Sequence, residues 1–148
     1  MILKLENLEP CPRNRSHTIV VRGKFAQNIK TEAARMYEQA IAQLLKPYKE
    51  QRDTFLASFD QDKHAIRADF YHGTPILFTK TGKISLNSVD LDGHKVLKDC
   101  IAEFMGIDDG YIIKDSNSKF YSPNHVTIIK LEVIPKEFTT DEINHAGF

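Results

Sequence analysis

The chain has no apolar stretch that approaches the length of a membrane span, and its first residues, Met1 to Glu6, lack the apolar core of a secretory signal. We therefore expect a cytoplasmic protein with no membrane partner. The two cysteines, Cys11 and Cys100, have neither a pairing pattern nor the spacing of metal ligands, and the six histidines are scattered. Disulfides and zinc chemistry therefore have no support in the sequence, and Cys100 is expected in the core.

Internal repeats and low-complexity segments are absent as well. A length of 148 residues is that of one domain with a core of its own. The hydrophobic share of 41% and the charged share of 27% are typical of a soluble globular domain. We expect a single domain over residues 1–135, followed by a C-terminal tail over residues 136–148.

An excess of either charge sign is also missing, since 20 basic residues face 20 acidic ones. This zero average conceals two segments of opposite charge. Residues 1–35 contain seven basic and three acidic residues, a balance of +4, whereas residues 87–115 contain three basic and seven acidic residues, a balance of −4. The acid-free stretch from Cys11 to Thr31 suits a polyanion such as nucleic acid. A solvated basic loop is the alternative.

Hydrophobic periodicity predicts the elements of the fold. Alternation with period two predicts strands at residues 2–8, 66–70, 76–79, 84–89, 111–119 and 126–134. Apolar spacings of three and four predict a helix that starts after Thr31 and ends near Pro47, and a second helix over residues 94–105 that ends at Gly106. The proline-rich segment and the basic residues after it predict a loop up to about Lys30. The predicted class is α+β, a small mixed sheet packed with two main helices.

Two pairs of aspartates give the strongest chemical signal. Asp90 and Asp92 end a predicted strand, where residues two apart point to the same side. Asp108 and Asp109 follow a predicted helix, so that two loops would bring the carboxylates together. Hard cations such as Mg²⁺ bind carboxylates, waters and phosphate oxygens. The pattern predicts a Mg²⁺ site, with Mn²⁺ as an alternative ion, that acts on a phosphate ester. Solvated turns, in which aspartate is common, are the other interpretation.

The order of these motifs resembles the RusA-type Holliday junction resolvases, Mg²⁺-dependent endonucleases of phages, prophages and bacteria. The resemblance covers roughly residues 8–134 and begins with a proline-rich turn that ends in Asn14, followed by a basic loop and a helix. Its most specific part is the acid-x-acid pair, then Lys95 with Asp99 four residues later, then the double aspartate before a strand.

This resemblance implies a structure-specific endodeoxyribonuclease that cleaves four-way DNA junctions symmetrically in recombination or repair and that acts as a homodimer. It implies that Asp90, Asp92 and Asp109 hold the metal and that Asp108 is a further ligand or orients the others. Lys95 would stabilise the transition state, and Lys98, one helical turn further on, is the alternative lysine. Basic side chains are expected to contact DNA: Arg13, Arg15, Arg22, Lys24, Lys80 and Lys83.

The sequence departs from the family pattern at three places. Gly93 stands where the family usually has asparagine, and the spacing from Asp92 to Lys95 is one residue shorter. The segment between Gly73 and Ser88 is longer, and residues 141–148 have no counterpart. Two other functions stay open. One is a RusA-like protein that binds nucleic acid but cuts it weakly or not at all, and the other is a different metal-dependent nuclease or phosphohydrolase.

Overall fold

The computed structural model describes residues 1–8, 17–22, 25–86, 88, 95–137 and 147, with the backbone alone for residues 17–22 and 25–30. A mixed sheet has the strand order β1-β6-β4-β5, formed by β1 (Ile2–Glu6), β6 (Val126–Pro135), β4 (His64–Thr74) and β5 (Ile112–Tyr121). β6 is antiparallel to β1 and β4, whereas β4 and β5 are parallel. The predicted α+β class is confirmed, and so are the strands predicted at 2–8, 66–70, 111–119 and 126–134.

The two predicted helices are present as α2 (Glu32–Leu45) and α4 (Lys95–Met105). The Thr31 hydroxyl accepts a hydrogen bond from the Ala34 amide at 3.2 Å, the expected N-cap. At the end of α4, Gly106 has a φ of +68°, and the Ile107 amide bonds to the Ala102 carbonyl at 3.1 Å. This is the Schellman pattern, which favours glycine because its φ is positive. No helix in the described part of the chain is long and apolar enough to cross a membrane.

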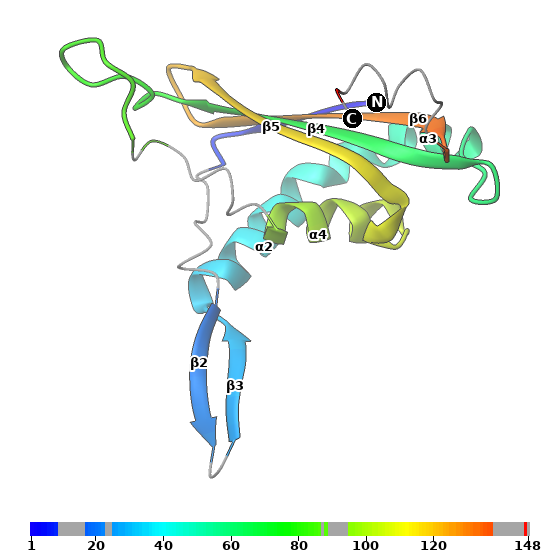
Figure 1. The fold of residues 1–148 in the computed structure, drawn as a ribbon, viewed down its shortest axis with the longest axis horizontal. Helices are drawn as coiled ribbons and strands as arrows, with labels where there is room; N and C mark the ends of the chain where they lie inside the picture. Colours follow the sequence, from blue (N-terminus) through cyan, green and yellow to red (C-terminus); the bar gives the residue numbers. More distant parts are fainter. Residues whose placement is uncertain (9–16, 23–24, 87, 89–94, 138–146, 148) are drawn as a thin grey trace.

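Both main helices lie on the same face of the sheet (Figure 1), and they also contact each other. Alternation in the strands sends apolar residues toward these helices. The largest fully buried apolar side chains form the core: Leu3, Leu5, Ile41, Leu45, Ile66, Phe70, Leu97, Ile101, Ile129 and Leu131. The opposite face of the sheet carries charged side chains such as Lys4, Arg67 and Lys130.

The prediction of a loop up to Lys30 is wrong where β2 (His17–Arg22) and β3 (Phe25–Lys30) form an antiparallel hairpin, and residues 9–16 and 23–24 lie outside the described chain. Figure 1 shows this hairpin extending away from the sheet and its helices. The basic charge and the prolines suggested a loop. The β-branched residues that follow His17 are instead typical of a strand.

α2 ends at Leu45, close to Pro47 as predicted, but two helical elements that were not predicted follow it directly, η1 (Lys46–Tyr48) and α3 (Lys49–Ala57). Proline is tolerated in the first turn of a new helix, where its missing N–H has no partner to lose. Residues 76–79 and 84–86 are not strands, and the single bridge between Phe78 and Ile84 is all that the described residues form there. A single bridge without adjacent bridges does not make a ladder, so these two segments are not strands.

Gly73 is the glycine at which a side chain would be costly. A Cβ at this position in β4 would lie 2.5 Å from Val126 Cγ1, 2.8 Å from Phe120 Cζ and 2.9 Å from Ser122 Cβ. We expect Gly73→Ala to lower the free energy of unfolding by about 1–3 kcal/mol, as overpacking usually does. Urea unfolding measures this, with the exposed Ser118→Ala on β5 as the control. Equal midpoints for both variants would mean that the neighbours of Gly73 give way freely.

Candidate active site

Asp108 and Asp109 lie directly between α4 and β5. Asp108 is the N-cap of η3 (Asp109–Tyr111), and its Oδ1 accepts a hydrogen bond from the Gly110 amide at 2.8 Å. Asp109 is the first residue of that short helix, and both aspartates are exposed. One Asp108 oxygen is therefore committed to the turn. The turn in this way fixes the backbone from which the Asp109 carboxylate extends.

Lys95 and Lys98 have different surroundings. Lys95 is the first residue of α4, in the first turn as predicted, and its side chain is exposed. Lys98 Nζ donates to Asp115 Oδ2 at 3.0 Å, which ties α4 to the edge strand β5. The Lys98 side chain is 25% exposed, so this ion pair is partly shielded from water. Lys98 therefore already has a structural partner, whereas the described geometry leaves Lys95 directed at solvent.

The length of α4 separates the two parts of the predicted site. The helix has 11 residues and rises about 1.5 Å per residue, so its ends lie about 15 Å apart. Lys95 is at one end, and Asp108 and Asp109 follow the other. The described part of one chain therefore does not bring Lys95 and Asp109 together. Asp90 and Asp92 lie outside the described residues.

The donor atoms fit a hard cation. The described residues contain no group of three or more His, Cys, Asp or Glu that could hold a metal ion. Mg²⁺, however, usually takes only one or two carboxylates and completes its shell with waters and phosphate oxygens. The exposed carboxylates of Asp108 and Asp109 suit this mode of binding. The metal site with Asp90 and Asp92 stays a prediction.

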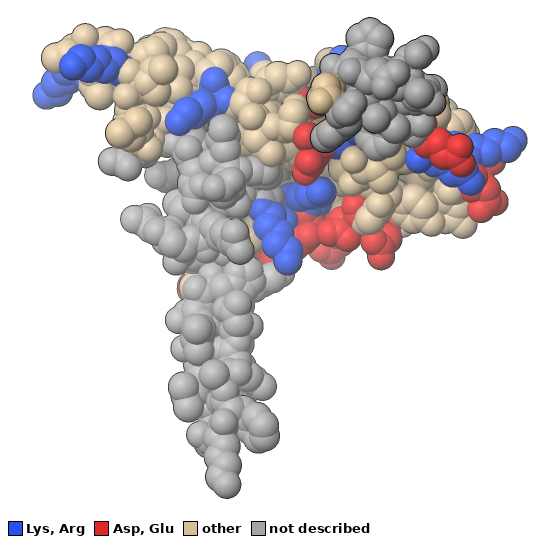
Figure 2. Space-filling model, viewed as in Figure 1, with Lys and Arg blue, Asp and Glu red and all other residues tan. Residues whose placement is uncertain are grey.

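The expected DNA-binding residues are only partly within the described chain. Arg13, Arg15 and Lys24 lie outside it, and Arg22 is the last residue of β2. Lys80 and Lys83 are exposed in a tight turn in which the Thr79 amide donates to the Lys83 carbonyl at 2.7 Å. Figure 2 shows basic side chains at the far tip of this loop, at the upper left.

The burial of one charged side chain, that of Asp69, was not predicted. Asp69 in β4 is only 4% exposed, and it accepts from Ser116 Oγ at 2.5 Å and pairs with Arg67 Nε at 3.0 Å. On the neighbouring strand, Lys130 Nζ donates a hydrogen bond to Glu132 Oε1 at 2.8 Å. This hydrogen bond lowers the pKa of Glu132 and raises the pKa of Lys130. Alternation along β4 predicts that Asp69 points away from the core. Its burial comes from the strands on both sides of β4, which a local pattern does not reveal.

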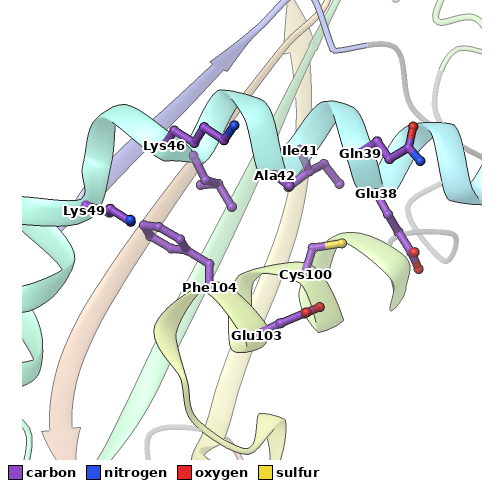
Figure 3. A pocket seen from close by; sticks show the side chains of 10 residues that line it. Glu38, Gln39, Ile41, Ala42, Lys46, Lys49, Cys100, Glu103 and Phe104 are labelled. Atoms are coloured by element: carbon purple, nitrogen blue, oxygen red, sulfur yellow. The ribbon is translucent and has the colours of Figure 1, made fainter.

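A groove of about 410 Å³ lies between α2 and α4 (Figure 3). Half-buried Cys100 and Phe104 line it, so Cys100 packs against the core rather than inside it. Glutamates and lysines line the same groove, from both helices and from the start of α3. None of the predicted metal ligands lines this groove.

In comparisons with known proteins, no family model and no curated sequence matches this chain. The order of motifs in the sequence and the placement of their described residues therefore carry the functional interpretation.

Proposed function

We propose that this protein is a Mg²⁺-dependent, structure-specific endodeoxyribonuclease that resolves four-way DNA junctions by symmetric phosphodiester cleavage in recombination or repair. The observation that carries the proposal is the ordered series of acid-x-acid pair, lysine and double aspartate in one α+β domain. Two described features support parts of it. Lys95 is exposed at the start of α4, and an exposed double aspartate follows the other end of this helix, about 15 Å away along its axis.

In this proposal Asp90, Asp92 and Asp109 would hold Mg²⁺, or Mn²⁺ in its place. The chemistry that such an ion would supply when bound is a lower pKa of a bound water and stabilisation of charge on the phosphodiester. Asp108 positions Asp109 through the hydrogen bond with the Gly110 amide. Lys95 supplies positive charge to the phosphate as negative charge develops there.

Two symmetric cuts across a four-way junction need two equivalent active sites. A homodimer with two-fold symmetry supplies them most simply, because each copy then presents the same residues to one of two related strands. We therefore propose a homodimer in the cytoplasm, where branched DNA is the partner.

Two features of the chain bear on the two other functions. Gly93 in place of the usual asparagine favours a binding protein with little cleavage. An enzyme for a small phosphate ester needs an enclosed pocket with its catalytic groups inside. The groove between α2 and α4 contains no predicted ligand, and Asp109 is exposed, which suits a large substrate better.

A gel assay with four-way junction, duplex and single-stranded DNA, each with and without Mg²⁺, tests the proposal. We expect cleavage of the junction alone, only with the metal, and at symmetric positions on two opposing strands. Junction binding with no cleavage would favour the binding protein. Hydrolysis of a small phosphate ester with no effect on any DNA would favour the phosphohydrolase.

The basic loop is tested by the double variant Arg13→Ala with Arg15→Ala. Each lost phosphate contact should reduce the slope of log affinity against log salt concentration by about one, and should weaken binding equally for different DNA sequences. Binding titrations at several salt concentrations measure this slope. Lys46→Ala with Lys49→Ala, which removes two lysines at the groove between the helices, is the matched control. If the two double variants have the same slope as the wild type, Arg13 and Arg15 do not contact DNA phosphates.

A further inference from the structure

Large apolar side chains are exposed at one end of the sheet, in the loop after β4 and at the end of β5. Five of the nine exposed large apolar residues of the described chain lie there, with these exposed fractions: Ile76 51%, Phe78 49%, Ile84 64%, Leu86 91% and Tyr121 56%. Single exposed apolar residues are ordinary, but a group at one place usually marks a binding surface.

Backbone hydrogen bonds and a ring contact hold this loop in a defined shape. The Ser85 amide donates to the Leu77 carbonyl at 2.8 Å, and the bridge between Phe78 and Ile84 sets those two side chains opposite each other. Leu77 is only 8% exposed and anchors the loop, while its neighbour Phe78 points outward. The Phe78 and Tyr121 rings are stacked, with centroids 6.4 Å apart and planes at 29°. The loop therefore presents a preformed aromatic surface.

Charge at this end of the sheet favours an anion. No acidic residue occurs from Phe70 to Val89, nor from Ser116 to Leu131. Exposed Lys80 and Lys83 extend the loop beyond the aromatic pair, and the basic side chains at its tip are visible in Figure 2. Glu6, the acid at the end of β1, is paired with Lys4 at 3.1 Å. Aromatic faces beside lysines suit nucleic acid better than another protein surface.

We propose that Phe78 and Tyr121 form a stacking platform for unpaired DNA bases, and that Lys80 and Lys83 contact the phosphates beside them. Every base has a flat face, so aromatic side chains bind single strands with little regard to sequence, and lysines follow the backbone. The platform deepens the proposed function, on which its role at a junction rests. Bases at the centre of a branched DNA are the ones available to leave their stack.

Fluorescence anisotropy with labelled oligo(dT) tests the platform, using the whole protein. We expect Phe78→Ala and Tyr121→Ala each to weaken binding by about 5- to 150-fold, the range for one lost aromatic stack. Phe78→Tyr and Tyr121→Phe keep the ring and should bind like the wild type. Met36→Ala is the matched control, because Met36 is 62% exposed on α2, away from the loop.

The lysines are tested separately, so that the result does not depend on the folding of the alanine variants at the aromatic positions. Lys80→Ala with Lys83→Ala should reduce the salt slope of oligo(dT) binding by about 0.7 per lost contact. Wild-type affinity in Phe78→Ala and Tyr121→Ala, or no binding of oligo(dT) by the wild type, would overturn the platform. Loss of self-association in these variants with unchanged oligo(dT) binding would also overturn it and assign the surface to protein contact.

Different results would contradict the proposed platform and the proposed nuclease. A wild type that cuts junctions but binds no oligo(dT) leaves the nuclease standing and removes the platform. A wild type that binds oligo(dT) through Phe78 and Tyr121, but cuts no junction with Mg²⁺, keeps the platform and removes the nuclease.

Discussion

Asp109→Asn is expected to abolish Mg²⁺-dependent cleavage of a four-way junction, while binding in metal-free buffer stays equal to the wild type or becomes tighter. Asparagine keeps the shape of the side chain but removes the negative charge that attracts the ion. The same loss of charge reduces repulsion of the DNA phosphates. Asp90→Asn and Asp92→Asn should have the same effects. In all three variants the cleavage rate should fall by more than the roughly 10–100-fold that is typical when a group that only orients a metal ligand is lost.

Asp108→Asn separates a ligand from a positioning residue. Asparagine is still able to accept the hydrogen bond that Asp108 Oδ1 receives from the Gly110 amide, so the turn should persist. If Asp108 only positions Asp109, this variant should retain most cleavage. If it binds the ion, cleavage should fall as for Asp109→Asn, with partial recovery at high Mg²⁺.

Single-turnover cleavage and gel binding measure these effects, and Asp62→Asn is the control because Asp62 is exposed and lies in the turn before β4. A variant at position 90, 92 or 109 that cuts as fast as the wild type would remove that residue from the metal site.

Lys95→Ala is expected to lose most cleavage with junction binding nearly unchanged, whereas Lys98→Ala should be mild. The first turn of a helix is a poor place for a cation, because the helix dipole is positive there. Nearby carboxylates and a bound phosphate would offset this cost at Lys95. Lys98 is explained by its ion pair with Asp115, and its loss should cost at most about 1 kcal/mol of stability.

Cleavage rates on a preformed junction complex decide between the lysines, with thermal unfolding to follow the stability of each variant. If Lys98→Ala lost more cleavage than Lys95→Ala, Lys98 would be the catalytic lysine. The shorter spacing after Asp92 would then have pointed to the wrong lysine.

Lys95 and Asp109 are separated by about 15 Å along α4. Mixed dimers of one Lys95→Ala chain and one Asp109→Asn chain test whether the two residues of one active site come from one chain or from both. If each site takes Lys95 and Asp109 from one chain, both sites of the mixed dimer are defective and no strand is cut. If each site takes them from different copies, one site is intact and a single nick is expected.

Much of the fold follows from local sequence chemistry. Thr31 starts α2 because its hydroxyl accepts from the Ala34 amide, and Gly106 ends α4 because glycine adopts a positive φ. Apolar spacing along the chain placed both main helices and the strands of the sheet within a few residues. These signals depend on neighbours in sequence, which is why they were readable without a structure. The β-branched residues of β2 are also a local signal for a strand, but the charge and proline content of the segment favoured a loop in the prediction.

The tertiary structure decided what depends on residues far apart in the chain. The burial of Asp69 comes from β5 and β6 on either side of β4, and the stack of Phe78 on Tyr121 joins residues from separate elements. The ion pair between Lys98 and Asp115 likewise needs α4 to lie over β5. The sequence by itself determined which residue types are available for metal and DNA. Only the packing of helices on the sheet determined which of them meet, because contacts across the fold leave no period in the sequence.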